Sequence, residues 1–239
     1  MPQPFLQVEG EIPLKGVLQT PRSKNAILPI MAASLLVDGK VRIRNVPRIR
    51  DMDWMLRVLH WSGVKAQRVD PDVEIQVVGP PREEIPSEVT RKLRASLLVL
   101  GPLTARWGKV RIHRPGGCAI GVRSIHFHLQ GLEKLGARVE ERHGVIEVTC
   151  SQRLRGNKIH LDYPSVGATE NLVMAATLAT GETEIHNVAQ EPEVVDLCKF
   201  LTSAGAQIEG IGSSVLRISG VPSLKPVDYM PTSDRIAAG

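Results

Sequence analysis

Three stretches of the chain share one pattern of alternating polar and apolar positions. Each starts at a glycine suited to a turn and continues like a half-buried strand, whose side chains point in turn to water and to the core. The stretches are Gly39–Arg44, Gly108–His113 and Gly181–His186. Their glycines are 69 and 73 residues apart. This spacing predicts a structural unit that is repeated three times along the chain.

Helical spacing of apolar residues surrounds each of these strands. The helices predicted before the strands are Ala26–Leu36, Val89–Leu103 and Ala168–Leu178. Those predicted after them are Asp51–Gly63, Val122–Gly136 and Glu191–Gly205. Two strands then follow, most clearly at Ala137–Glu140 with Val145–Thr149 and at Ala206–Glu209 with Val215–Ser219. A leading strand is most visible at Lys158–Leu161. Three such units pack most simply with their sheets outside and their helices sharing an interior.

Both ends of the chain fall outside the repeat. Phe5–Lys15 reads as a strand or hairpin before the first unit. After Gly220 the chain is rich in turn formers, which predicts a linker.

Composition narrows the class of protein. The chain has 30 Lys and Arg against 25 Asp and Glu, so its formal net charge is +5. These basic residues are scattered, and aromatic residues make up only 3% of the chain. Both features argue against nucleic-acid binding. No apolar stretch is long enough to span a membrane, and no signal peptide begins the chain. We therefore expect a cytoplasmic protein without a nucleic-acid or membrane partner.

The three cysteines, Cys118, Cys150 and Cys198, are far apart and lack metal-ligand spacing, so we expect no disulfide, metal site or cofactor. Cys118 lies in a glycine-rich loop before a predicted helix N-terminus, a position that favours anions and lowers the pKa of a thiol. A small buried apolar residue is the alternative reading. The flanking Arg114 and Arg123 favour a thiol beside an anionic substrate.

The longer motif Gly116-Gly-Cys-Ala-Ile-Gly-Val-Arg123 resembles the cysteine loop of the UDP-N-acetylglucosamine enolpyruvyl transferases. Other motifs follow the order found in this family, namely Ser23–Ile30 with its Lys-Asn pair, the arginine segment Leu93–Leu103, Tyr163–Asn171, Glu191–Asp196 and Ser233–Ile236. The resemblance implies an α+β fold, an inside-out αβ domain of three βαβαββ repeats with helices inside and sheets outside.

The family moves the enolpyruvyl group of phosphoenolpyruvate onto the 3-hydroxyl of UDP-N-acetylglucosamine and releases phosphate, and fosfomycin, a phosphonate epoxide, attacks its cysteine. The resemblance implies that Cys118 is the general acid. It implies that Lys24 is catalytic and holds phosphoenolpyruvate with Asn25, while Arg94 and Arg123 supply further cations. Without the resemblance, Lys24 also fits a solvated lysine in a turn. Arg94 then also fits a surface arginine that lies along apolar neighbours.

The acceptor nucleotide is assigned by the resemblance to two segments, Ser124, Ile125, His126 and Phe127 in one and Tyr163, Ser165, Val166 and Gly167 in the other. Free N–H groups at the start of the helix after Tyr163 suit a diphosphate, and Ser165 also fits a simple helix cap. Asp234 and Arg235 match a family pair at a domain junction. Glu191 and Glu193 are explained by the dipole of their helix alone, so we leave them out of the site.

This chain departs from the family pattern at three places. Pro21 and Arg22 stand where small residues are usual, and His126 stands where the family commonly has aspartate. His126 and His128 are two residues apart, so on a helix they point to different faces, which argues against a metal site.

The resemblance also divides the chain. Residues 22–220 would form the three-repeat domain, while residues 1–21 and 221–239 would be a stub, a linker and the start of a second domain. That second domain supplies the base for the sugar hydroxyl, so we expect the chain alone to be inactive and to associate with itself through exposed strand edges. The alternatives are a shikimate 3-phosphate enolpyruvyl transferase, which the cysteine loop disfavours, and a non-catalytic domain that binds a nucleotide sugar or a partner chain.

Overall fold

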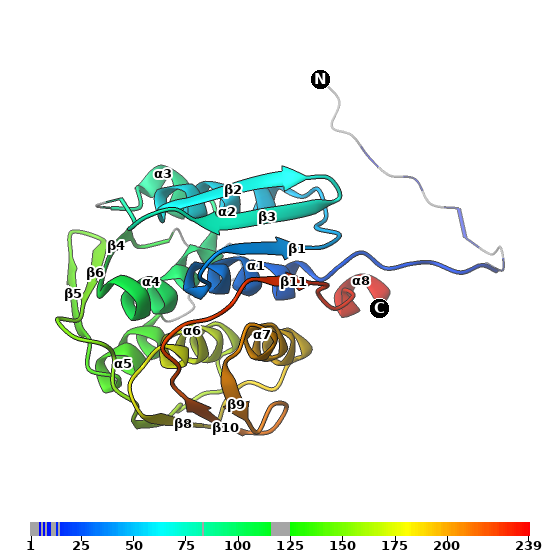
Figure 1. Cartoon of the computed structure of the whole chain (residues 1–239). Coiled ribbons are helices and arrows are strands. Elements are labelled where there is room, and N and C mark those ends of the chain that lie inside the picture. Colours follow the sequence, from blue (N-terminus) through cyan, green and yellow to red (C-terminus); the bar gives the residue numbers. More distant parts are fainter. Residues whose placement is uncertain are drawn as a thin grey trace.

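The computed structural model describes residues 5, 7, 9, 10, 13, 15–82, 84–115 and 125–239. In these residues the predicted repeats form three sheets on the outside of the body (Figure 1). The first sheet has the strand order β11 (Val227–Tyr229), β1 (Lys40–Ile43), β3 (Asp72–Val77) and β2 (Val64–Val69). The last has the order β7 (Lys158–His160), β8 (Glu182–His186), β10 (Val215–Ser219) and β9 (Gln207–Glu209).

The middle sheet has the order β4 (Lys109–His113), β6 (Val145–Thr149) and β5 (Arg138–Arg142). In all three sheets the strand after the turn glycine pairs antiparallel with the last strand of the following hairpin. The other two units each have a leading strand that pairs in parallel. In the middle unit, a single parallel bridge between Ile85 and Ile112 takes its place. The shared topology confirms the threefold repeat.

Helices fill the interior between the sheets (Figure 1). α1 (Lys24–Ala33), which leads into the short 3-10 helix η1 (Ser34–Leu36), and α6 (Val166–Thr177) are buried all round beyond their first two residues. α4 (Leu100–Trp107) is buried over most of its length. Helices that are apolar on every side belong in a protein core, so the inside-out αβ fold is confirmed.

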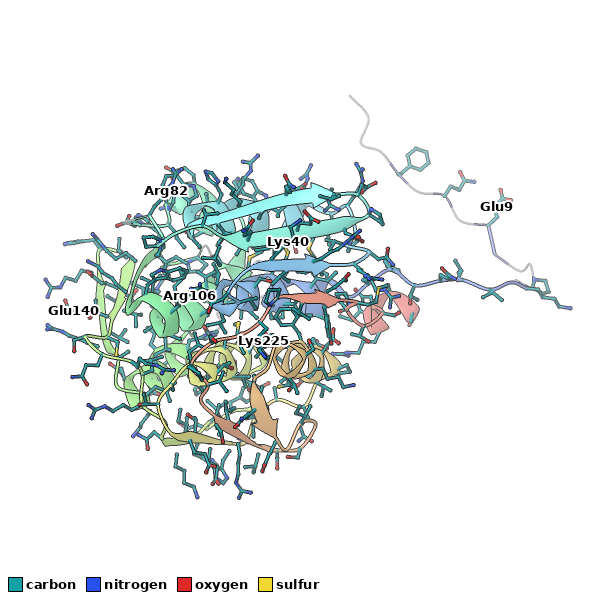
Figure 2. The ribbon with its side chains drawn as sticks, in the orientation of Figure 1. Glu9, Lys40, Arg82, Arg106, Glu140 and Lys225 are labelled. Carbon is teal, nitrogen blue, oxygen red and sulfur yellow. The ribbon has the colours of Figure 1, made fainter. Side chains whose placement is uncertain are left out.

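The second helix of each repeat packs one face against this interior. These helices are α2 (Arg50–Trp61), α5 (His126–Lys134) and α7 (Pro192–Ser203). The outer faces of the sheets carry charged side chains, such as Lys40 on β1 and Glu140 on β5 (Figure 2). Lys40 Nζ, for example, lies 2.8 Å from Oε2 of Glu74 on the neighbouring strand β3.

The single helix predicted over Val89–Leu103 is wrong. This segment contains α3 (Ser87–Thr90), the 3-10 helix η2 (Arg94–Val99) and the start of α4. The Gly101 N–H donates to Oδ1 of Asn171 at 2.5 Å, and Nδ2 of Asn171 donates to the Leu97 carbonyl at 2.9 Å. The amide therefore takes the place of the α-helical bond between Gly101 and Leu97, and a side chain inserted in this way interrupts a helix.

A strand or hairpin was predicted at Phe5–Lys15, and none of the described residues there lies in a helix or strand. Residues 15–20 lead away from the body as an extended arm (Figure 1). Helix α5 begins at His126, and the predicted helix residues 122–124 lie outside the described residues.

Strand β11 comes from the segment that was predicted as a linker and the start of a second domain. It pairs in parallel with β1, with Val227 opposite Val41, and Arg44 holds the Asp228 carboxylate with two hydrogen bonds of 2.6 and 2.7 Å. In the first sheet β11 takes the place that β7 has in the last sheet. The leading strand of the first repeat thus comes from the far end of the chain.

Candidate active site

The N-terminus of α1 carries Lys24 and Asn25, which were predicted to hold phosphoenolpyruvate. Ser23 caps this helix, because its hydroxyl oxygen accepts a hydrogen bond from the Ala26 N–H at 3.4 Å. Lys24 Nζ lies 3.1 Å from Oδ2 of Asp51 in the first turn of α2, and both side chains are partly exposed. An exposed pair of this kind contributes little stability, so an incoming anion can compete with Asp51 for the ammonium group.

Two segments far apart in the sequence lie side by side next to Lys24. Residues 21–23 and 232–234 form an antiparallel pair joined by two backbone hydrogen bonds of 2.9 Å. Asp234 caps the short helix α8 (Arg235–Ala238), and its Oδ2 also accepts a hydrogen bond from the Lys24 N–H at 3.4 Å. Burial tends to raise the pKa of Asp234, but backbone hydrogen bonds from Ala237 and Ile236, with that from Lys24, outweigh it and lower the pKa.

Arg235 reaches from this junction to α7. Its guanidinium donates to both oxygens of Glu193, at 3.2 and 3.3 Å, and Glu193 is buried. We left Glu193 out of the site because the helix dipole explained it, and the structure gives it a partner from the predicted junction pair. Both residues lie in motifs that carry the family resemblance, so the sequence singles out each of them. It does not show that they pair with each other.

Glu170, on α6, lies near the Arg235–Glu193 pair. It is buried, and its Oε1 has no hydrogen-bond partner among the described residues. Burial raises the pKa of Glu170 well above its ordinary value, and the carboxylates of Glu193 and Glu191 raise it further. Burial and these neighbouring charges thus favour the protonated form of Glu170.

The N-terminus of α6 is the predicted diphosphate site. Ser165 is the cap, with its hydroxyl oxygen 3.4 Å from the Ala168 nitrogen, and its own N–H donates to the Tyr163 carbonyl at 2.7 Å. Val166 and Gly167 are half-buried, and Tyr163 is exposed. The first N–H groups of an α-helix have no partner within the helix, and the helix dipole favours an anion in front of them.

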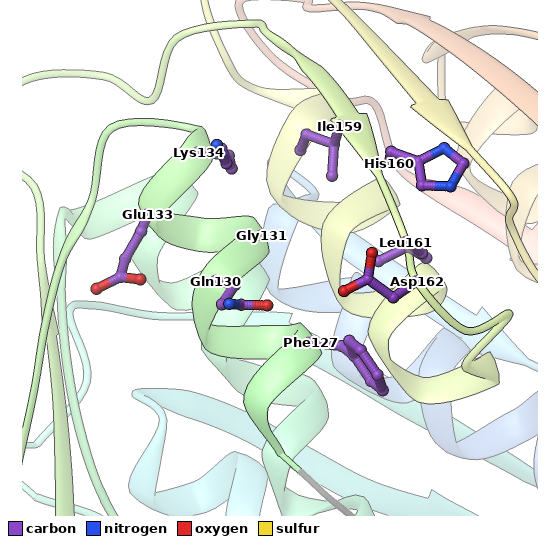
Figure 3. A pocket seen from close by; sticks show the side chains of 9 residues that line it. All are labelled: Phe127, Gln130, Gly131, Glu133, Lys134, Ile159, His160, Leu161 and Asp162. Carbon is purple, nitrogen blue, oxygen red and sulfur yellow. The ribbon is translucent and has the colours of Figure 1, made fainter.

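The start of α5 lies beside a groove of about 500 Å³. Ile125 is buried, His126 is exposed and Phe127 is half-buried. In Figure 3 the side chains of Phe127 and Asp162 project into the space between α5 and the segment that connects β7 to α6, whereas His160 points away from α5. One end of the groove is thus lined by Phe127, from one segment predicted to hold the nucleotide, and by Asp162, which precedes Tyr163 of the other.

Arg94 is the first residue of η2, and its charge acts on His128, for which the sequence suggests no role beyond a disfavoured metal site. Burial and then the charge of Arg94 lower the pKa of His128 to about 4. Nδ1 of His128 lies 2.9 Å from Nδ2 of Asn171, and both side chains are buried. Asn171 and Glu170 are neighbours on α6. This helix therefore contacts His128, near Arg94, through Asn171, and lies near Glu191 and Glu193 through Glu170.

Three predicted site residues, Cys118, Arg123 and Ser124, lie outside the described residues. Within the described part of the chain, no cluster of three His, Cys, Asp or Glu side chains is arranged to hold a metal ion. In that same part, no helix combines the length and the apolar character that crossing a bilayer requires.

A family model described as EPSP synthase (3-phosphoshikimate 1-carboxyvinyltransferase) matches residues 8–239. The chain belongs to this family. The description of this family names a carboxyvinyl, or enolpyruvyl, transferase. This finding confirms the enzyme family that the motifs indicated.

Relatives within the family carry a more specific name. UDP-N-acetylglucosamine 1-carboxyvinyltransferase 1 of Symbiobacterium thermophilum is 49% identical over 237 residues, which are 97% of this chain and 52% of the relative. UDP-N-acetylglucosamine 1-carboxyvinyltransferase of Desulfatibacillum aliphaticivorans is 50% identical over 232 residues, which are 97% of this chain and 56% of the relative. The chain spans about half the length of the curated relatives that it matches.

Solved structures of family members share the fold. The enolpyruvyl transferase NikO from Streptomyces tendae matches with a TM-score of 0.81 at 23% identity, over 94% of this chain and 53% of that chain. EPSP synthase from Acinetobacter baumannii matches with a TM-score of 0.73 at 18% identity, over 91% of this chain and 50% of that chain.

Proposed function

We propose that this chain provides one wall of an enzyme that transfers the enolpyruvyl group of phosphoenolpyruvate to the 3-hydroxyl of UDP-N-acetylglucosamine. The observation that carries the proposal is the 49–50% identity, over nearly the whole chain, to relatives named for this activity. The cationic N-terminus of α1 and the open N-terminus of α6 support it, because both substrates are anions. The reaction belongs to peptidoglycan precursor synthesis, and we place it in the cytoplasm.

The reaction is an addition followed by an elimination. In the addition, the sugar oxygen bonds to carbon 2 of phosphoenolpyruvate, its proton leaves to a base, and carbon 3 gains a proton from Cys118. In the elimination, carbon 3 loses a proton, the bond from carbon 2 to the phosphate oxygen breaks, and phosphate departs. Lys24, Asn25, Arg94 and Arg123 hold the phosphate and carboxylate and stabilise the charge that develops on them.

The acceptor nucleotide lies along the starts of α5 and α6 in this proposal. The backbone N–H groups of Val166 and Gly167, with the Ser165 hydroxyl, bind the diphosphate. Ser124–Phe127 and Tyr163 flank the nucleoside, and the groove beside Phe127 gives it room. No cofactor takes part.

Binding to the 239-residue chain tests this proposal. We expect UDP-N-acetylglucosamine to bind with a dissociation constant on the order of millimolar, because a single wall leaves much of the ligand in water. Calorimetry with UDP-N-acetylglucosamine and with shikimate 3-phosphate separates the two family activities, since only the first ligand should release heat.

The double variant Arg123→Ala, Ser165→Ala should abolish this binding. Arg155→Ala, Ser151→Ala is the matched control, because both of its residues are exposed and lie outside the proposed site. Unchanged binding by the first variant, or binding of shikimate 3-phosphate alone, contradicts the proposal.

A further inference from the structure

Asn171 is locked in one orientation by the interrupted helix. Its Oδ1 accepts the Gly101 N–H and its Nδ2 donates to the Leu97 carbonyl, and the side chain is fully buried. A side chain at residue 101 would not fit here, because a Cβ on Gly101 would lie 2.2 Å from the backbone carbonyl oxygen of Asn171. Rotating the amide would set its NH2 group against the Gly101 donor, so the amide cannot flip.

This orientation determines the tautomer of His128. The second hydrogen on Nδ2 of Asn171 points at Nδ1 of His128, 2.9 Å away. Nδ1 must therefore accept, and in a neutral imidazole the proton is then on Nε2. Burial and the charge of Arg94, which lower the pKa of His128 to about 4, keep the ring neutral through the physiological range.

The protonated nitrogen faces the first turn of α6. A Cβ on Gly167 would lie 3.2 Å from Cε1 and 3.4 Å from Nε2 of His128, so the edge of the ring is packed against this residue. The imidazole is only 6% exposed, and its contact with Asn171 uses Nδ1, which leaves Nε2 available to a ligand. The Nε2 edge of an almost fully buried ring thus lies against the first turn of a helix whose N-terminus favours anions.

We propose that His128 donates a hydrogen bond from Nε2 to an anionic oxygen held at the N-terminus of α6, and that Asn171 is the positioning residue that fixes this tautomer. The inference rests on the proposed function, in which the anion is the diphosphate of the acceptor nucleotide. A neutral donor suits this place, because the hydrogen bond persists over the whole pH range in which the ring stays uncharged.

Nitrogen-15 spectra of the imidazole rings of the 239-residue chain, assigned by single substitutions, test the tautomer directly. We expect His128 to show a protonated Nε2 and an unprotonated Nδ1 from pH 8 down to about pH 5. UDP should shift its Nε2 resonance, whereas uridine, which lacks the diphosphate, should not. Inorganic phosphate should cause a smaller shift in the same direction. A proton on Nδ1, or a titration near the ordinary value, overturns the inference.

Binding measurements on variants test the role of the donor. His128→Phe removes it, and we expect UDP to bind at least about 10-fold more weakly, the usual effect of losing a hydrogen bond to a charged group. His128→Gln keeps an N–H donor and should stay within about 3-fold of the wild type. His143→Asn is the matched control, because His143 is an exposed turn residue with a positive φ of 52°.

Gly167→Ala provides a second, independent test, because its methyl group would press on the imidazole. We expect weaker UDP binding and a displaced Nε2 resonance, whereas Gly79→Ala, where a Cβ meets nothing within 4 Å, should change neither. If UDP binds the wild type but His128→Phe binds it equally well, the inference fails and the proposed function stands. If UDP does not bind the wild type at about 10 mM, both fail.

Discussion

Two neighbouring residues of α6 deal with burial in different ways. Asn171 is buried and fully hydrogen-bonded, so it fixes its surroundings without carrying a charge. Glu170 is buried with an oxygen that has no partner among the described residues, and burial raises its pKa, which favours the uncharged form. Such a carboxyl makes the stability of the fold depend on pH.

The sign of this dependence follows from the raised pKa. Above the pKa of the unfolded chain, near 4.5, the unfolded state has released the Glu170 proton while the folded state keeps it. Stability therefore falls as the pH rises from there towards the folded pKa. Glu170→Gln stays neutral in both states, so we expect it to be more stable than the wild type at pH 7–8 by about 1 kcal/mol or more.

Thermal unfolding between pH 4 and pH 8 measures this difference, which should shrink as the pH approaches 4. Glu133→Gln is the control, since Glu133 is exposed on α5 and its substitution should leave the pH profile unchanged. A wild type that becomes more stable relative to Glu170→Gln as the pH rises would show that Glu170 is ionised in the fold.

Among the three thiols, we expect Cys118 to react fastest with fosfomycin, because of its glycine loop and flanking arginines. We expect Cys198 to react slowly, since burial and then the nearby Glu170 raise its pKa to about 12. Cys150 lies half-buried beside the Gly136 carbonyl. Mass spectrometry of the treated chain locates the adduct, and Cys118→Ser should abolish it. Labelling at Cys150 or Cys198 would contradict the prediction.

The sequence predicted the position of those candidate site residues that belong to contiguous motifs. Lys24, Asn25 and Ser165 are in such motifs, and the structure places them at the helix starts where they were expected. His128 and Glu193 were not identified, because their roles depend on partners 43 and 42 residues away in the sequence. Periodicity and capping rules describe neighbours along the chain, so they cannot reveal such pairs.

At the scale of elements, strand β11 is joined to α7 by Tyr229. Its hydroxyl donates to Oδ1 of Asp196 at 2.8 Å, and its ring meets Phe200 edge-on with centroids 5.4 Å apart. Oδ2 of Asp196 accepts the Thr232 N–H at 2.9 Å. These contacts tie the end of the first sheet to the third repeat.

Tyr229→Phe should destabilise the fold by about 1–3 kcal/mol, because it removes a hydrogen bond to a buried carboxylate. Tyr229→Ala also loses the aromatic pair and should cost about 1 kcal/mol more. Urea unfolding measures both values. The chain has only one other tyrosine, Tyr163, which is exposed, so Tyr163→Phe is a matched control with an effect near zero. Equal stability of Tyr229→Phe and the control would show that β11 is not held in this way.

The local elements of the repeats were largely predictable, because strand alternation and helical spacing are properties of short segments. Two elements were not. The break between η2 and α4 depends on Asn171, which lies 70 residues beyond Gly101. The place of β11 depends on β1, and a three-residue strand gives too short a pattern to predict its partner.

At the scale of the whole molecule, the three-repeat body carries one side of the proposed site. By the resemblance, a second domain supplies the base for the sugar hydroxyl and further cations. Asp234 and Arg235, the pair predicted at the domain junction, contact Lys24 and Glu193. Each contact joins the predicted junction pair to a helix N-terminus of the body.

The chain alone should not turn over at an enzymatic rate. Losing the help of a general base typically costs about 10²–10⁴-fold, and losing preorganised charge costs more. A phosphate-release assay with both substrates measures the rate, with Cys118→Ser as the control for background hydrolysis. Turnover near one per second, an ordinary value for an enzyme, would show that the body holds the complete site.

The antiparallel pair of residues 21–23 and 232–234 also has a topological consequence. Because these two segments are hydrogen-bonded neighbours, the polypeptide enters and leaves the body at one point. Chains whose ends meet in this way tolerate circular permutation and insertion into other proteins. A short link between Pro21 and Asp234 should therefore close the body into a ring, and the exposed turn at His143 and Gly144 offers a place for new termini that leaves all three sheets paired.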